Sequence, residues 1–193
     1  MPGSRVAGWI MSASASPFRR AAEALETKGV LDGPAKPARA LAGKALSPGA
    51  VKATLSGAWL GHALHPILTD VVVGSFVSAS LLDFLGGDPD GTAAERLLAV
   101  GIAAYAPTAL TGVSDWSDRA DTDPGVRRVG IVHAASNAAA LSLYSASLAS
   151  RRNGARHRGK LLALAGGAVL GAGGYLGGHL TLVQGVGVER RSG

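Results

Sequence analysis

The sequence of 193 residues contains no cysteine. Without a thiol, the chain cannot form a disulfide, supply a thiolate to haem, or hold an iron–sulfur cluster or a zinc ion through cysteine. Charged side chains are also scarce, at 17% of the residues, whereas 47% are hydrophobic and 28 residues are glycine. This balance favours a bundle of membrane helices over the core of a soluble domain.

Positive charge is concentrated near the N-terminus. Residues 1–56 carry eight Lys or Arg against three acidic residues, whereas the remaining chain carries eleven against ten. A basic, aromatic-poor tail before a membrane span favours contact with anionic lipid rather than nucleic acid. We therefore divide the chain into a basic N-terminal tail, residues 1–56, and a membrane domain, residues 57–188.

Short amphipathic helices are expected in the tail, after a disordered start over residues 1–16. The pattern from Phe18 to Leu31 is helical, with apolar residues on one face and charged residues on the other. The pair Gly33-Pro34 is predicted to end this helix, and residues 37–46 are predicted to form a second short one. Both segments are assigned to the membrane surface.

Four apolar stretches are long enough to cross a bilayer, which takes about 20 helical residues. The first is Trp59–Leu85, where Pro66 falls in the first helical turn and therefore costs little. The others cover about residues 93–113, 126–149 and 161–180. Because short loops join them, the sequence predicts an all-α integral membrane four-helix antiparallel bundle with an N-terminal amphipathic surface segment. In the last stretch, small-xxx-small spacing predicts a face that packs closely against another helix; it consists of Gly167, Gly171, Gly174 and Gly178.

Alternating helix direction places most of the histidines in one half of this bundle. The first and third stretches begin on the membrane side where the second and fourth end. Six polar groups belong to that half: His62, His65, Asp70, Asp115, His133 and His179. His157 lies in a basic loop on the opposite side, where we expect a surface role.

Neutral imidazole is a good axial ligand of haem iron, so one interpretation is a haem b held by two histidines from different helices. The candidate cofactor ligands, which are equally the candidates for a non-haem metal, are His62, His65, His133 and His179. Among them His133 is favoured because it lies well inside a span, on a helical face that it shares with Asn137, Ala140 and Tyr144. Its expected partner is His65 or His179. The residues expected to hydrogen-bond the second ring nitrogen of a ligand are Asp70, Asp115 and Asn137.

A structural role is the alternative. A cluster of His and Asp side chains can tie helices together by hydrogen bonds, without any cofactor, in an accessory membrane subunit. The colour of the purified protein distinguishes the two hypotheses. The sequence assigns no catalytic residue, so enzymatic activity stays an open question.

Four motifs carry a resemblance to a known family: GHALHPILTD, TGVSDWSD, VHAASNAAA and GGYLGGHLTLVQGVGV. Over about residues 20–188 the chain resembles an uncharacterised bacterial family of four-helix membrane proteins, domain of unknown function 2231. The resemblance implies the fold and an inner-membrane location, but no established activity. Some relatives resemble fusions to a Rieske iron–sulfur domain, which implies electron transfer. Because this chain has no cysteine, such a redox partner must be a separate protein, or the partner is quinone.

The expected location is the bacterial inner membrane, crossed several times, with lipid as the main partner. Lys and Arg near the span ends divide seven to six between the two sides, so the positive-inside rule does not decide the orientation. The basic tail favours cytoplasmic termini. A homo-oligomer is compatible with these features, whereas nucleic acid is not an expected partner.

Overall fold

The structure, a computed structural model, describes residues 16–46, 49–86 and 91–188. The expected disorder of residues 1–16 falls almost entirely outside these ranges. Within them the regular elements are seven α-helices with short 3-10 and π turns, so the all-α prediction is confirmed. Three short helices come first: α2 (Pro17–Thr27), α3 (Asp32–Ala45) and α4 (Ala50–Ser56). Four long helices follow: α5 (Leu64–Leu85), α6 (Thr92–Ala120), α7 (Pro124–Arg152) and α8 (Arg156–Gly178).

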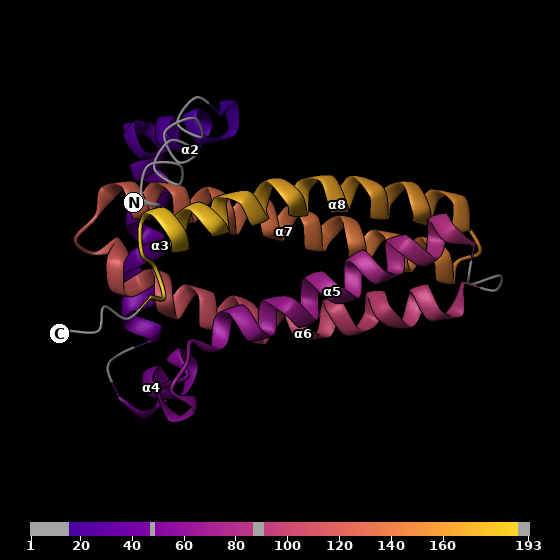
Figure 1. Cartoon of the computed structure of the whole chain (residues 1–193), viewed down its shortest axis with the longest axis horizontal. Helices are drawn as coiled ribbons and strands as arrows, with labels where there is room; N and C mark the ends of the chain where they lie inside the picture. The colour runs from indigo at the N-terminus through magenta and orange to yellow at the C-terminus, as the bar shows by residue number, and fades with distance from the viewer. Residues whose placement is uncertain (1–15, 47–48, 87–90, 189–193) are drawn as a thin grey trace, which may run out of the picture.

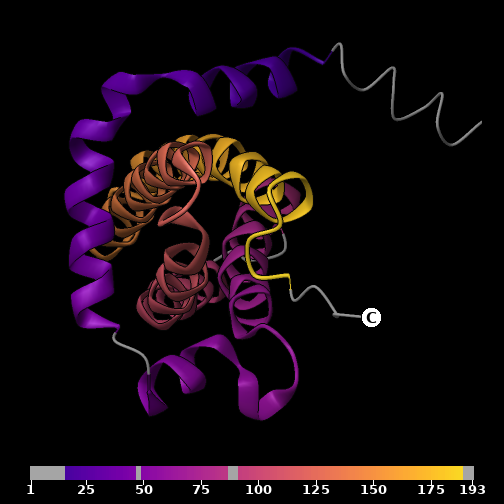
Figure 2. The ribbon, with the colours of Figure 1, turned by 90° about the vertical axis from the view of Figure 1, so that its left-hand side faces the viewer.

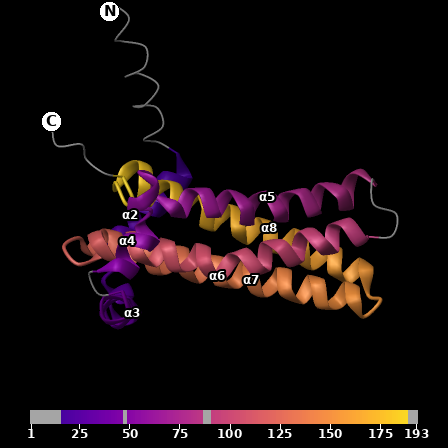
Figure 3. The same cartoon turned by 90° about the horizontal axis from the view of Figure 1, so that it is seen from below.

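The four long helices run side by side, and consecutive ones point in opposite directions (Figures 1 and 3). α5 packs along α6 and α7 packs along α8, which gives a first hairpin (α5–α6) and a second hairpin (α7–α8). The hairpins join mainly through α6 and α7, whereas α5 and α8 touch less. α2, α3 and α4 surround the end of the molecule where α5 and α7 begin (Figure 2).

Three of the long helices in the described part of the chain are apolar enough to cross a membrane. They are α5, α6 and α8, the last extended by the π turn His179–Val183. α7 has the length, at 29 residues, but not the apolar character. It carries arginines near both ends and the polar residues His133 and Asn137 between them. By composition, the structure therefore supports three of the four expected crossings.

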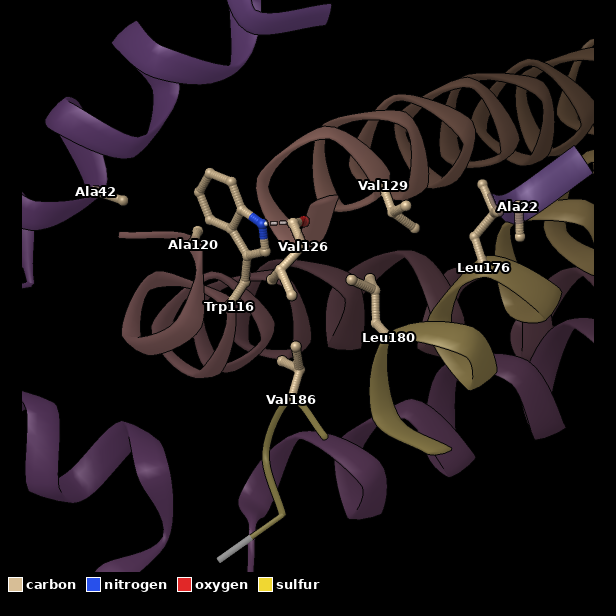
Figure 4. Close-up of a cluster of buried hydrophobic side chains, with 9 residues drawn as sticks. All are labelled: Ala22, Ala42, Trp116, Ala120, Val126, Val129, Leu176, Leu180 and Val186. Carbon is tan, nitrogen blue, oxygen red and sulfur yellow. Dashed lines mark hydrogen bonds between the residues drawn. The ribbon is translucent and has the colours of Figure 1, made fainter. Parts of the chain in front are cut away.

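α6 is longer than predicted. It continues to Ala120 instead of ending near residue 113, so much of the segment expected to be the loop between the second and third apolar stretches is helical. Trp116 explains the extension, because its side chain is buried and its indole N–H donates to the carbonyl of Val126, 3.1 Å away (Figure 4). The carboxylate of Asp123 then caps α7 by accepting hydrogen bonds from two backbone N–H groups of its first turn.

The surface segment bends at Lys28 rather than at Gly33-Pro34. α2 ends at Thr27, and after one 3-10 turn α3 begins at Asp32. Gly33 and Pro34 thus lie in the first turn of α3 and do not terminate a helix. Proline is tolerated there because the first N–H groups of a helix have no acceptor within it.

A hydrophobic cluster docks the surface segment onto the long helices (Figure 4). It contains Ala22, Ala42, Trp116, Ala120, Val126, Val129, Leu176, Leu180 and Val186. Beside it, the guanidinium of Arg128 on α7 donates hydrogen bonds of 3.0 and 2.8 Å to the carboxylate of Asp32 on α3. These hydrogen bonds lower the pKa of Asp32 to about 2. The surface segment is therefore held by both apolar burial and charge.

The second hairpin repeats the packing of the first. Phe76 on α5 rests against Gly101 on α6, where a Cβ atom would lie 2.5 Å from the ring. Tyr144 on α7, 68 positions after Phe76, rests against Gly166 on α8, where a Cβ atom would lie 3.2 Å from the ring. Gly166 follows Gly101 by 65 positions. The second hairpin is thus a structural repeat of the first. Equivalent residues of α5 and α7 are 68 positions apart, and those of α6 and α8 are 65 positions apart.

Equivalent residues of α5 and α7 also meet each other between the hairpins. The rings of Phe76 and Tyr144 stack, with centroids 3.8 Å apart and planes 12° apart. Arg151, again 68 positions after Asp83, donates hydrogen bonds of 2.9 and 2.5 Å to the carboxylate of Asp83. Contacts between equivalent positions are what an approximate two-fold axis between two repeats produces.

The packed glycine face of α8 differs from the predicted one. The α8 glycines at which a Cβ atom would lie closer than 3.4 Å to an α7 side chain are Gly159, Gly166, Gly173 and Gly177. Nothing lies within 4 Å of the Cβ position at three of the four predicted ones: Gly171, Gly174 and Gly178. The large side chains of α7 set this register. Because their positions depend on the partner helix, the spacing of glycines within α8 could not reveal it.

Candidate functional site

A cavity of about 1550 Å³ lies between the two hairpins. We call it the central cavity. Its lining is mostly aliphatic and includes residues at equivalent positions of the repeat, such as Val73 and Leu141, Tyr105 and Leu170, and Ala109 and Gly174. The cavity reaches the outer surface beside α5 and α8, where the lining residues Leu81 and Leu164 are each 52% exposed. It is larger than the roughly 300–1,000 Å³ of most small-molecule sites.

His65 lines the central cavity from the first turn of α5. Its Nδ1 lies 2.9 Å from the carbonyl oxygen of Thr108 and 3.3 Å from Oγ1 of Thr111, both on α6. A carbonyl oxygen can only accept, so Nδ1 carries the proton of the neutral ring and Nε2 keeps its lone pair. Gly112 permits this approach, because a Cβ atom there would lie 2.7 Å from Cε1 of His65.

His133 lines the same cavity from α7 and is held in the same way. Its Nδ1 donates to the carbonyl oxygen of Gly173 on α8, 2.8 Å away. A Cβ atom at Gly177 would lie 2.9 Å from Cε1 of the ring. The side-chain amide nitrogen of Asn137, one turn further along α7, lies 3.1 Å from Nε2.

The two histidines occupy equivalent positions of the repeat. His133 follows His65 by 68 positions, and the acceptor Gly173 follows Thr108 by 65. Each ring lies against the neighbouring helix of its own hairpin, and both rings line the central cavity. Two imidazoles of the same tautomer therefore border one largely apolar space.

The structure does not bring the four predicted histidines together. His62 is exposed in the turn before α5. His179 is 4% exposed, but its Nε2 lies 2.6 Å from Oε1 of Glu26 on α2, away from the cavity lining. Within the described ranges, no three His, Cys, Asp or Glu residues form a group that could hold a metal ion. The geometry therefore does not support the expected non-haem metal site built from His62, His65, His133 and His179.

The three residues predicted to hydrogen-bond the histidines lie in different surroundings. Asn137 lines the cavity beside His133, as expected. Asp70 is exposed on α5 and lies outside the cavity lining, rather than buried beside a histidine. Asp115 lines the cavity and is 8% exposed, but the hydrogen bonds of the described residues include none between it and a histidine. Backbone carbonyls satisfy the ring nitrogens instead.

Sequence reasoning missed the groups that hold the two histidines. Thr108 and Gly173 act through backbone carbonyls, which the type of residue does not reveal. The usable signal was a glycine one turn later in each case, Gly112 and Gly177. The predicted stripe on α7 is confirmed, since all four of its members line the cavity: His133, Asn137, Ala140 and Tyr144.

Comparison with known proteins places the long helices within one family. A family model described as "Predicted membrane protein (DUF2231)" matches residues 61–190, a range that includes both hairpins. No curated protein and no solved structure matches the chain.

Proposed function

The chain belongs to the DUF2231 family of predicted membrane proteins, and we propose that it is a membrane haem protein that transfers electrons. In this proposal haem b binds between His65 and His133 in the central cavity. All four long helices cross the bacterial inner membrane, because the polar residues of α7 face the cavity rather than lipid, and both termini are cytoplasmic. The electron partner is quinone or a separate iron–sulfur protein.

The matched pair of imidazoles is the observation that carries this proposal. Histidines that bind a metal commonly donate their second ring N–H to a backbone carbonyl, which fixes the tautomer and the orientation of the ring. His65 and His133 both donate in this way through Nδ1, at 2.9 and 2.8 Å. In each ring, Nε2 is the nitrogen that would hold the haem iron.

The central cavity suits a large, flat, apolar cofactor. Haem supplies a one-electron couple at its iron when bound. Around it, the aliphatic lining excludes water, and Gly112 and Gly177 let the two histidine rings lie close to the helices that hold them. The amide of Asn137, now 3.1 Å from Nε2 of His133, must turn away for that nitrogen to bind.

The geometry favours His65 over His179 as the partner of His133. His179 is joined to Glu26 through Nε2, so a cofactor would have to break that contact and detach α2. His65 needs no such change, since no acceptor or donor within the described residues contacts its Nε2. The sequence allowed either His65 or His179 as the partner of His133, and we therefore propose His65.

The test is an absorption spectrum of detergent-purified protein from haem-replete cells. We expect a Soret band and sharp α and β bands after reduction, and we expect either His65→Ala or His133→Ala to abolish them. His157→Ala, at an exposed position, and His179→Ala should keep the bands. A folded wild-type protein that stays colourless after haem reconstitution would refute the proposal.

A structural role is the second candidate, and one observation favours it. His65 ties α5 to α6 and His133 ties α7 to α8, so each ring already has a hydrogen-bonded place without a cofactor. In that case the protein is a colourless accessory subunit. His133→Ala would then lower its thermal stability and change no spectrum.

A further inference from the structure

Asp115 on α6 carries a buried carboxylate that has no role in the proposed haem site. Among the described residues that line the central cavity it is the sole acidic one, and it is 8% exposed. No hydrogen bond reaches it from any residue that the structure describes. The nearby ammonium of Lys52 is engaged elsewhere, with Asp118 at 2.7 Å and the carbonyl of Ser114 at 2.6 Å.

The repeat shows that packing does not require this carboxylate. The residue 65 positions later is Leu180, which lies in the π turn that follows α8. Leu180 also lines the central cavity and is 5% exposed, so an aliphatic side chain fills the same position of the fold. The carboxylate oxygens of Asp115 stay accessible from the cavity, and ionisable groups at membrane depth commonly mark binding sites. Asp115 therefore points to a ligand.

We propose that Asp115 binds the head group of an isoprenoid quinol in the central cavity. An ionised carboxylate can only accept hydrogen bonds, so it recognises a hydroxyl donor, and a quinol carries such hydroxyls on a flat ring. Trp116, the next residue along α6, also lines the cavity, with most of its ring packed in the hydrophobic cluster. Leu110, which lies on α6 near Asp115, also lines the cavity and is 53% exposed, so the apolar tail can reach lipid there.

The quinol site shares the cavity with the proposed haem but does not depend on it. At about 1550 Å³, the cavity exceeds what one ordinary small-molecule ligand fills. Asp115 and the two cavity histidines are separate residues, so each site can be tested while the other is left intact. The proposal concerns binding alone and includes no redox step.

Binding is measured with heptylhydroxyquinoline N-oxide, a fluorescent quinol analogue whose emission is quenched when it binds a protein. The full chain in detergent is titrated, and Kd is compared among three variants. Asp115→Leu, which copies the second hairpin, should raise Kd at least tenfold. Asp115→Asn keeps an acceptor oxygen and should raise Kd less. Asp70→Leu removes a carboxylate from a membrane helix outside the cavity and should leave Kd unchanged.

The outcomes separate this proposal from the haem proposal. Saturable quenching that Asp115→Leu abolishes, while its thermal unfolding midpoint matches that of the wild type, supports the quinol site whether or not a Soret band is present. If the Leu variant does not fold, Asp115→Asn still decides, because the proposal requires its Kd to rise. Wild-type protein that does not quench the probe, or quenching indifferent to both Asp115 variants, would overturn the quinol site and leave the haem assay untouched.

Discussion

Replacing Arg151 with methionine should destabilise the protein by breaking the ion pair that joins the two hairpins. Arg151 on α7 is 4% exposed, and the side chain of its partner Asp83 on α5 is 7% exposed. The guanidinium donates two hydrogen bonds to the carboxylate, and its Nε donates to Oγ of Ser147. Methionine has a similar length but no charge, so the substitution removes the pair with little change in volume.

The expected cost follows from what the substitution leaves behind. Removing one partner of a buried ion pair costs about 3–5 kcal/mol, because the other charge stays buried and unpaired. Here Lys160 remains near Asp83, with its Nζ 3.8 Å from Oδ1 and its side chain 42% exposed. We therefore expect the low end of this range, about 3 kcal/mol. For a chain of this size that is a fall in Tm of roughly 6–12 °C.

The assay is thermal unfolding of the variants in one detergent. Arg152→Met, at the exposed neighbouring position, is the matched control and should keep the wild-type Tm. The double variant Asp83→Leu with Arg151→Met removes both charges and should recover most of the loss, to within about 1 kcal/mol. An Arg151→Met variant as stable as the control, or a double variant no better than the single one, would refute the description of the hairpin interface.

Two further predictions concern packing and charge. The new side chain of Gly177→Leu should overlap the ring of His133. We expect this variant to lower the free energy of unfolding by about 1–3 kcal/mol and to remove any haem absorbance. Gly178→Leu, at a position with nothing within 4 Å, should change neither the stability nor the absorbance. Asp32 has a pKa lowered to about 2 by hydrogen bonds from Arg128. The pKa of Asp32 in the folded protein lies below the ordinary value of about 3.9. The ionised carboxylate therefore stabilises the docked α3 fully when the pH is above that ordinary value, and this stabilisation is lost as the pH falls toward about 2. The protection of α3 amides, measured as the ratio of the intrinsic to the observed exchange rate, should therefore fall between about pH 4 and pH 2. Asp32→Asn should show weak protection already at neutral pH, and equal protection in both proteins would contradict the role of the ion pair.

Local patterns in the sequence predicted the parts of the fold that local physics determines. The apolar run that ends at Leu85 and the helical stripe from His133 to Tyr144 needed only helical periodicity and length. The end of α6 could not be found in this way. Trp116 makes the segment after residue 113 helical by burying its indole against Val126, which is a tertiary contact.

Only part of the candidate site could be predicted from the sequence, for a similar reason. Helix direction predicted that His65 and His133 belong to the same half of the bundle, and both line the central cavity. It could not show that His179 bonds Glu26, because the two residues are 153 positions apart and α2 had no predicted place relative to α8. The side on which each ring lies depends on glycines of the partner helix, whose register only packing decides.

The repeat sets different requirements for the two ligands proposed for the central cavity. His65 and His133 are held alike, so a ligand bound by both must offer equivalent bonds on opposite sides, as a planar metal macrocycle does and a single hydroxylated ring does not. Asp115 has Leu180 as its equivalent, so a ligand that it recognises is bound from one hairpin only. The equivalent histidines therefore favour the haem as the ligand that both hairpins bind, whereas the unmatched Asp115 favours the quinol as the ligand that one hairpin binds. Leu180→Asp would restore the symmetry, and we expect it to add a second, independent quinol-binding event rather than to alter the haem spectrum.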